Sequence, residues 1–203
     1  MNVQPPNSQD NLVFHPYNIM LMLLLFGLSL LFLALTISYT YIRVTMQVPP
    51  VQLPWLFLFN TLILLGSSYT MIRAKDCYLE DNTEGYQFNL RYTIILSVFF
   101  TLMQGVAWAW LFKMNNIGMN ASTTAGFLYV LSITHLAHVL AGLPFLVGFY
   151  YTARKRMVDP VTVLIYFSDP EKRLKLRLLT IYWHFLDILW LFLVAFLGIN
   201  YLI

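Results

Sequence analysis

The sequence predicts an all-α membrane protein in which one domain, residues 1–203, forms a bundle of five transmembrane helices. Its composition is the first reason, because 59% of the residues are hydrophobic, 10% are charged and the mean hydropathy is +0.68. A soluble domain is typically about 45–50% apolar and about 25% charged. The second reason is that five apolar stretches reach the roughly 20 residues that cross a hydrocarbon core about 30 Å thick. We expect spans near residues 17–41, 53–72, 92–112, 123–151 and 178–203.

The distribution of Lys and Arg predicts how the bundle is oriented. Ten of the 12 basic residues fall on one side of the expected membrane, most of them in the loop after span four. The positive-inside rule then predicts a cytoplasmic N-terminus and an external C-terminus. Aromatic residues do not alternate with these basic residues, as they would on a surface that binds nucleic acid. The net charge of +3 therefore indicates contact with anionic lipid headgroups. No basic segment precedes span one, and we expect no cleavable signal peptide.

Span two carries more polar groups than a lipid-facing surface tolerates, with Asn60, Ser67 and Ser68 near Gly66. Small residues let a neighbouring helix approach closely, and Asn and Ser side chains hydrogen-bond across helices. The pattern therefore favours packing against another helix. A pathway for a polar solute is the alternative, but no other span aligns such groups on one face.

Prolines and charged residues mark the connections between spans. Pro54 is tolerated just inside the start of span two, because the N–H at that position is unpaired in any helix. Residues 74–89 are acidic at their centre and contain a glycine, which predicts a solvated turn. In the fourth loop, Ser168 or Asp169 before Pro170 predicts a capped helix start. The basic residues that follow indicate an interfacial approach to span five.

Span four contains two histidines, His135 and His138, which are three residues apart. Positions i and i+3 share one face of a helix. The same face carries Ala141 and Gly142, so we expect the histidines to point toward a closely packed helix.

In the largely apolar span five, the side chains expected to ionise are His184 and Asp187, again three residues apart. A carboxylate inside a membrane costs several kcal/mol unless it is paired, buried against protein or protonated. His184 is therefore expected beside Asp187, with Trp183 and Trp190 along the same stripe. The pattern predicts a polar, aromatic-flanked seam that faces protein.

The histidines of span four, with His184 and Asp187, offer the imidazole and carboxylate groups that hold divalent ions. A buried polar cluster in which imidazoles hydrogen-bond across helices explains the same residues, and we predict no metal and no cofactor in this chain. Motifs of phosphate-binding loops, serine hydrolases and zinc proteases are missing from the sequence, and no nucleophile accompanies Asp187. No catalytic residue is predicted, and Cys77 stands alone.

Three polar segments together resemble one known family. The segments NTLILLGSSYTM (60–71), THLAHVLAGL (134–143) and YWHFLDILWLF (182–192) are similar to signature segments of subunit III of the haem–copper oxidases, in the same order and spacing. The last segment is the most specific of the three. The resemblance runs from Tyr17 to the C-terminus and fits the five-span bacterial form of cytochrome c oxidase subunit 3.

The resemblance implies an accessory subunit of a respiratory oxidase in a bacterial inner membrane. Haem and copper would belong to partner subunits, and oxidase subunit I would be the main contact, with other oxidase subunits, phospholipids and a respiratory supercomplex as further partners. Such a subunit supports assembly, proton uptake and sustained turnover. Arg173 and Arg177 are available for lipid headgroups. The family motif positions, with an expected structural and lipid-organising role, are Asn60, Ser67, His135, His138, Trp183, His184, Asp187 and Trp190.

Two positions depart from the family pattern. Leu28 and Ala107 stand where relatives often have a glutamate, so any role of those carboxylates is in question here. Other functions compatible with the sequence are an accessory subunit of a quinol oxidase or of nitric oxide reductase, and an independent transporter or channel that uses the His and Asp cluster.

Overall fold

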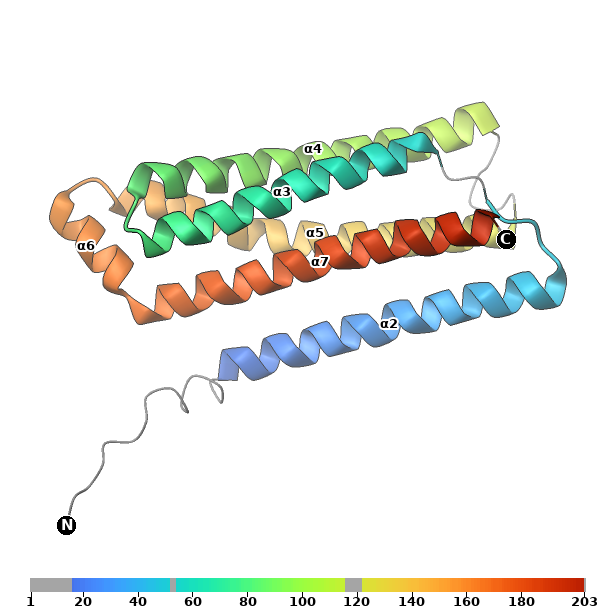
Figure 1. Ribbon diagram of the computed structural model, residues 1–203, viewed down its shortest axis with the longest axis horizontal. Coiled ribbons are helices and arrows are strands. Elements are labelled where there is room, and N and C mark those ends of the chain that lie inside the picture. The colour runs from blue at the N-terminus through green and yellow to red at the C-terminus, as the bar shows by residue number, and fades with distance from the viewer. Residues whose placement is uncertain (1–15, 52–53, 116–121, 203) are drawn as a thin grey trace, which may run out of the picture.

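The computed structural model describes residues 16–51, 54–115 and 122–202, and these form a bundle of long helices (Figure 1). Five of the helices are long and apolar enough to cross a membrane. They are α2 (Pro16–Met46), α3 (Trp55–Leu79), α4 (Thr83–Asn115), α5 (Thr123–Arg156) and α7 (Pro170–Leu202). The predicted all-α membrane fold is confirmed.

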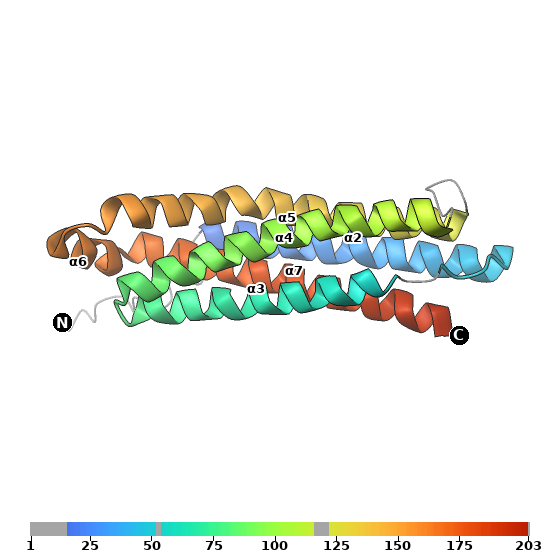
Figure 2. The ribbon, with the colours of Figure 1, turned by 90° about the horizontal axis from the view of Figure 1, so that it is seen from above.

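Successive long helices run in opposite directions, so the start of α2 and the α3–α4 turn lie at the same end of the bundle as the α5–α7 connection (Figures 1 and 2). This end carries most of the basic residues, in agreement with the alternation that the sequence predicts. Which end faces the cytoplasm stays a prediction.

The helices extend beyond the predicted spans at both ends of the bundle. The expected solvated turn over residues 74–89 is wrong in extent, because α3 continues to Leu79 and α4 begins at Thr83. The turn has three residues, 80–82, and holds two of the four acidic side chains, with Asp81 in the left-handed conformation at φ 55°. A further helix that the sequence did not predict, α6 (Pro160–Ser168), lies across the end of the bundle between α5 and α7 (Figure 1).

The core lies where α3, α4, α5 and α7 meet, and α2 packs on one side against α5 and α7. Trp190 fills the centre: its ring stacks on Phe57 of α3 at 5.5 Å and meets Phe100 of α4 edge-on at 5.2 Å. Such aromatic pairs prefer offset-stacked or edge-on geometry. One side chain therefore ties α7 to both helices of the α3–α4 hairpin.

Hydroxyl groups inside the helices bond mostly to their own backbone. Thr36 donates to the carbonyl of Phe32 at 3.0 Å, and Ser132 donates to that of Leu128 at 2.8 Å. A bilayer core holds no water to satisfy polar groups, so this internal bonding lets Ser and Thr occupy apolar helices. A hydroxyl that bonds to a different helix therefore marks a specific contact between the two helices.

Candidate functional site

Two indole N–H groups of α7 join it to α3. Trp183 donates to the Ser67 hydroxyl at 3.0 Å, and Trp190 donates to the Thr61 hydroxyl at 3.1 Å. The two tryptophans are seven residues apart, which is two turns of a helix, and so share one face. Both are almost fully buried. The aromatic stripe expected of span five therefore exists and faces α3.

His184 and Asp187 lie beside these tryptophans. The Nδ1 atom of His184 and the Ser68 hydroxyl are 2.7 Å apart, which forms a third hydrogen bond between α7 and α3. The same Nδ1 lies 3.8 Å from Oδ2 of Asp187, too far for a hydrogen bond. Asp187 is buried, and its Oδ2 has no hydrogen-bond partner among the described residues. His184 is thus bonded to Ser68 and only near Asp187.

Polar side chains also join α3 to α4. Asn60 donates from Nδ2 to Oε1 of Gln104 at 2.8 Å, with both residues fully buried. Thr70 of α3 and Thr93 of α4 share a second hydrogen bond, of 2.8 Å, closer to the α3–α4 turn. The helix contacts expected for span two are present, and α3 is hydrogen-bonded on two sides. Sequence reasoning missed Gln104 as the partner of Asn60, although an amide within a span is itself a signal of burial.

The two histidines of span four have different surroundings. His135 is fully buried, its ring lies 5.0 Å from that of Trp190, and neither ring nitrogen has a hydrogen-bond partner among the described residues. His138 is half-buried, and its Nδ1 bonds to the Thr134 carbonyl of its own helix at 2.7 Å. The expectation that these two imidazoles hydrogen-bond across helices is therefore wrong. Of the imidazoles in the described part of the chain, His184 alone does so.

No three His, Cys, Asp or Glu side chains gather closely enough to hold a metal ion in the part of the chain that the structure describes. Leu28 and Ala107 are both buried in the bundle. An apolar side chain suits those positions, because a carboxylate buried without a partner is costly.

α5 and α7 approach each other closely at Gly142. A Cβ atom placed on this glycine would lie 2.8 Å from Cε1 of Tyr182 and 3.1 Å from Cζ3 of Trp183. Tyr182 also donates its hydroxyl to the His138 carbonyl at 2.8 Å. The face of span four does meet a closely packed helix, and Gly142 is what permits the contact.

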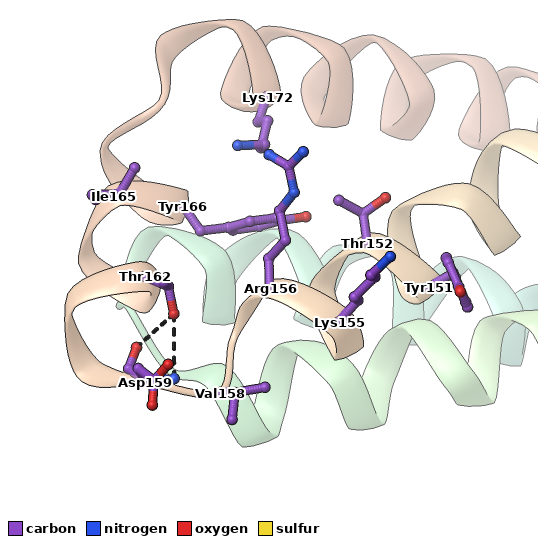
Figure 3. Close-up of a pocket in the computed structure, with 10 residues that line it drawn as sticks. All are labelled: Tyr151, Thr152, Lys155, Arg156, Val158, Asp159, Thr162, Ile165, Tyr166 and Lys172. Carbon is purple, nitrogen blue, oxygen red and sulfur yellow. Dashed lines mark hydrogen bonds between the residues drawn. The ribbon is translucent and has the colours of Figure 1, made fainter.

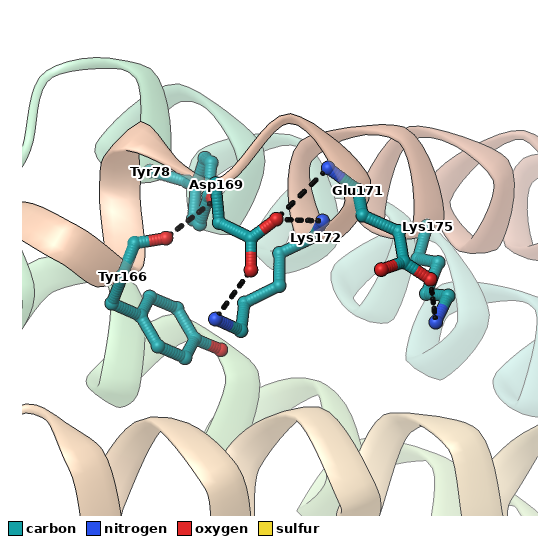
Figure 4. Close-up of polar contacts among 6 residues, drawn as sticks. All are labelled: Tyr78, Tyr166, Asp169, Glu171, Lys172 and Lys175. Carbon is teal, nitrogen blue, oxygen red and sulfur yellow. Dashed lines mark hydrogen bonds and ion pairs between the residues drawn. The ribbon is translucent and has the colours of Figure 1, made fainter.

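The N-terminus of α7 carries a second polar cluster, shown in Figure 4. Asp169 accepts from the backbone N–H of Glu171 at 3.0 Å and pairs with Lys172 Nζ at 2.7 Å, which confirms the predicted cap. These bonds, that from Lys172 foremost, hold the pKa of the Asp169 carboxyl below its usual range. Arg173 and Arg177 follow on α7, and both are exposed at the basic end of the bundle.

The chain matches known proteins over most of its length. Residues 10–201 match the family model described as cytochrome c oxidase subunit III. A probable cytochrome c oxidase subunit 3 from Rickettsia prowazekii is 33% identical over 151 residues, 74% of this chain and 49% of that protein. Cytochrome c oxidase subunit 3 from Myxine glutinosa is 32% identical over 145 residues, 71% of this chain and 49% of that protein.

A third relative, cytochrome c oxidase subunit 3 from Emericella nidulans, is 30% identical over 145 residues, 71% of this chain and 47% of that protein. The chain therefore spans about half the length of the curated relatives that it matches. The family match nevertheless covers nearly every residue that the structure describes. This chain belongs to the cytochrome c oxidase subunit III family.

Proposed function

We propose that this chain is the non-catalytic subunit III of a respiratory haem–copper oxidase in a bacterial inner membrane. The observation that carries the proposal is the α3–α7 seam. Trp183, His184 and Trp190 all hydrogen-bond to α3, so three side chains of the most specific motif form bonds between helices of this chain. Their role is to hold the bundle in the shape that docks on the catalytic subunit.

In this proposal haem and copper reside in partner subunits, with subunit I as the main contact. Phospholipids are expected at the basic end, where Arg173 and Arg177 are exposed. Each Lys or Arg near an anionic membrane surface contributes about 1 kcal/mol of attraction. The family sites Asn60 and Asp187 then act through packing, and the complex depends on them for sustained turnover.

Purification of the tagged chain from membranes in a mild detergent tests the proposal. We expect a larger subunit with the absorption bands of haem to co-purify, and the purified complex to reduce O2. Isolation of this chain without any haem-bearing partner would contradict the assignment. Co-purification with a nitric oxide reductase would place the chain in that complex instead.

A further inference from the structure

One face of α6 exposes apolar side chains although the helix is firmly attached to the bundle. Its attachment is aromatic: Phe167 meets Tyr78 edge-on at 5.1 Å, and the Tyr78 hydroxyl donates to the Tyr166 carbonyl at 3.1 Å. On the opposite side, three apolar residues of α6 and one just before its start are 63–73% exposed. We name this surface the α6 outer face, and its residues are Val158, Val161, Leu164 and Ile165.

The membrane does not reach this face. Trp190 lies near the middle of the apolar segment of α7, and α7 begins at Pro170. At 1.5 Å per residue, that start lies about 30 Å from the middle of the segment along the axis. Half of a hydrocarbon core is about 15 Å, and half of a bilayer with its headgroups is about 20–22 Å. α6 lies past the start of α7 at this end of the bundle (Figure 1), so the α6 outer face is beyond the lipid, where exposed apolar patches mark contacts with protein.

Positive charge borders the same face. A cavity of about 560 Å³ separates the end of α5 from α6, and three cations, Lys155, Arg156 and Lys172, line it together with one carboxylate, that of Asp159 (Figure 3). Lys172 is paired with Asp169, but Lys155 and Arg156 form no ion pair with any residue that the structure describes. An apolar centre with a charged rim is the usual anatomy of a protein interface.

We propose that the α6 outer face and the adjoining cations dock a carboxylate-bearing amphipathic segment of another subunit of the same complex. The inference rests on the proposed function, since it requires an oxidase complex. A second copy of this chain is a poor occupant, because the same end of the copy would be basic as well. Apolar side chains of the segment would cover Leu164 and Ile165, and its carboxylates would meet Lys155 and Arg156 across the cavity.

Photo-crosslinking in the intact complex tests the proposal. A benzoylphenylalanine is placed at Leu164, which is 66% exposed, and a control is placed at Glu80 in the α3–α4 turn of the same end. The purified complex is irradiated and the products are mapped by mass spectrometry. We expect Leu164 to crosslink to an acidic segment of an identified oxidase subunit.

Charge reversal adds a second measurement. Lys155→Glu with Arg156→Glu should lower the yield of that crosslink at least about fivefold. Arg73→Glu with Lys75→Glu, the same charge change on α3, should leave it unchanged. Crosslinks only to lipid, or none in a complex with its haem subunits intact, would overturn the docking surface alone. Purification without any haem subunit would overturn the proposed function.

Discussion

The indole of Trp183 on α7 donates to the Ser67 hydroxyl on α3 across 3.0 Å, and both residues are buried. Ser67 also lies 3.4 Å from Ser97 of α4, so one hydroxyl links three helices. Residues 116 positions apart are thereby fixed against each other. The closing motif of the family match depends on a small polar side chain in span two.

Ser67→Ala should destabilise the bundle by about 1 kcal/mol, because it leaves a buried indole N–H without a partner inside the membrane. Thermal unfolding in detergent, followed by circular dichroism, measures the change. Ser29→Ala is the matched control, since the Ser29 hydroxyl is exposed and donates to the Leu25 carbonyl of its own helix. Equal effects of the two substitutions would show that the Trp183 contact contributes nothing.

Gly142→Ala should destabilise the bundle by about 1–3 kcal/mol through overpacking. The added Cβ would lie 2.8 Å from a ring atom of Tyr182, and that ring is held by its bond to the His138 carbonyl. Gly148→Ala in the same helix meets nothing within 4 Å and should be neutral or slightly stabilising. Thermal unfolding of both variants in one detergent provides the comparison. A neutral Gly142→Ala would mean that α5 and α7 separate easily.

The membrane fold and the seam of span five could be predicted because both follow from local patterns. Apolar runs of sufficient length give the helices, and the spacing of Trp183, Asp187 and Trp190 gives their shared face. The partners on other helices depend on how the helices are rotated and paired. Neither the Asn60 bond to Gln104 nor the unbonded ring of His135 can be read from the spacing of residues within one helix.

The sequence does not predict helix α6, and the reason is a different one. It has only nine residues, and a proline such as Pro160 at its start is equally typical of a loop. What stabilises it is tertiary, since Tyr166 and Phe167 pack against Tyr78 and Tyr86 from the α3–α4 hairpin. The sequence also overestimates the length of the solvated turn, for another reason. Polar residues at 74–89 indicate exposure to water, and helices that extend past the membrane are exposed to water as well.

The stability of the α7 N-terminus should depend on pH through Asp169. Its partners hold the pKa of this carboxyl below the ordinary value of 3.8, so its contribution is fully present above that pH and is lost as the pH falls through the lower, folded-state value. The melting temperature, measured between about pH 6 and pH 2, should fall less for Asp169→Asn than for the parent protein. An equal fall in melting temperature for Asp169→Asn and the parent protein would show that this carboxyl contributes nothing.

Asp187→Leu should shorten the working life of the oxidase more than it lowers the initial rate. Asp187 is buried beside His184, which is bonded to Ser68, so its removal perturbs the α3–α7 seam and no redox centre. The measurement is O2 consumption over repeated turnovers, with the initial rate and the half-life of activity fitted separately. Asp187→Asn keeps the shape of the side chain without its charge and should retain more of the half-life. A collapse of the initial rate, with subunit composition and haem content intact, would instead indicate that Asp187 transfers protons directly, because packing defects act on assembly and lifetime first.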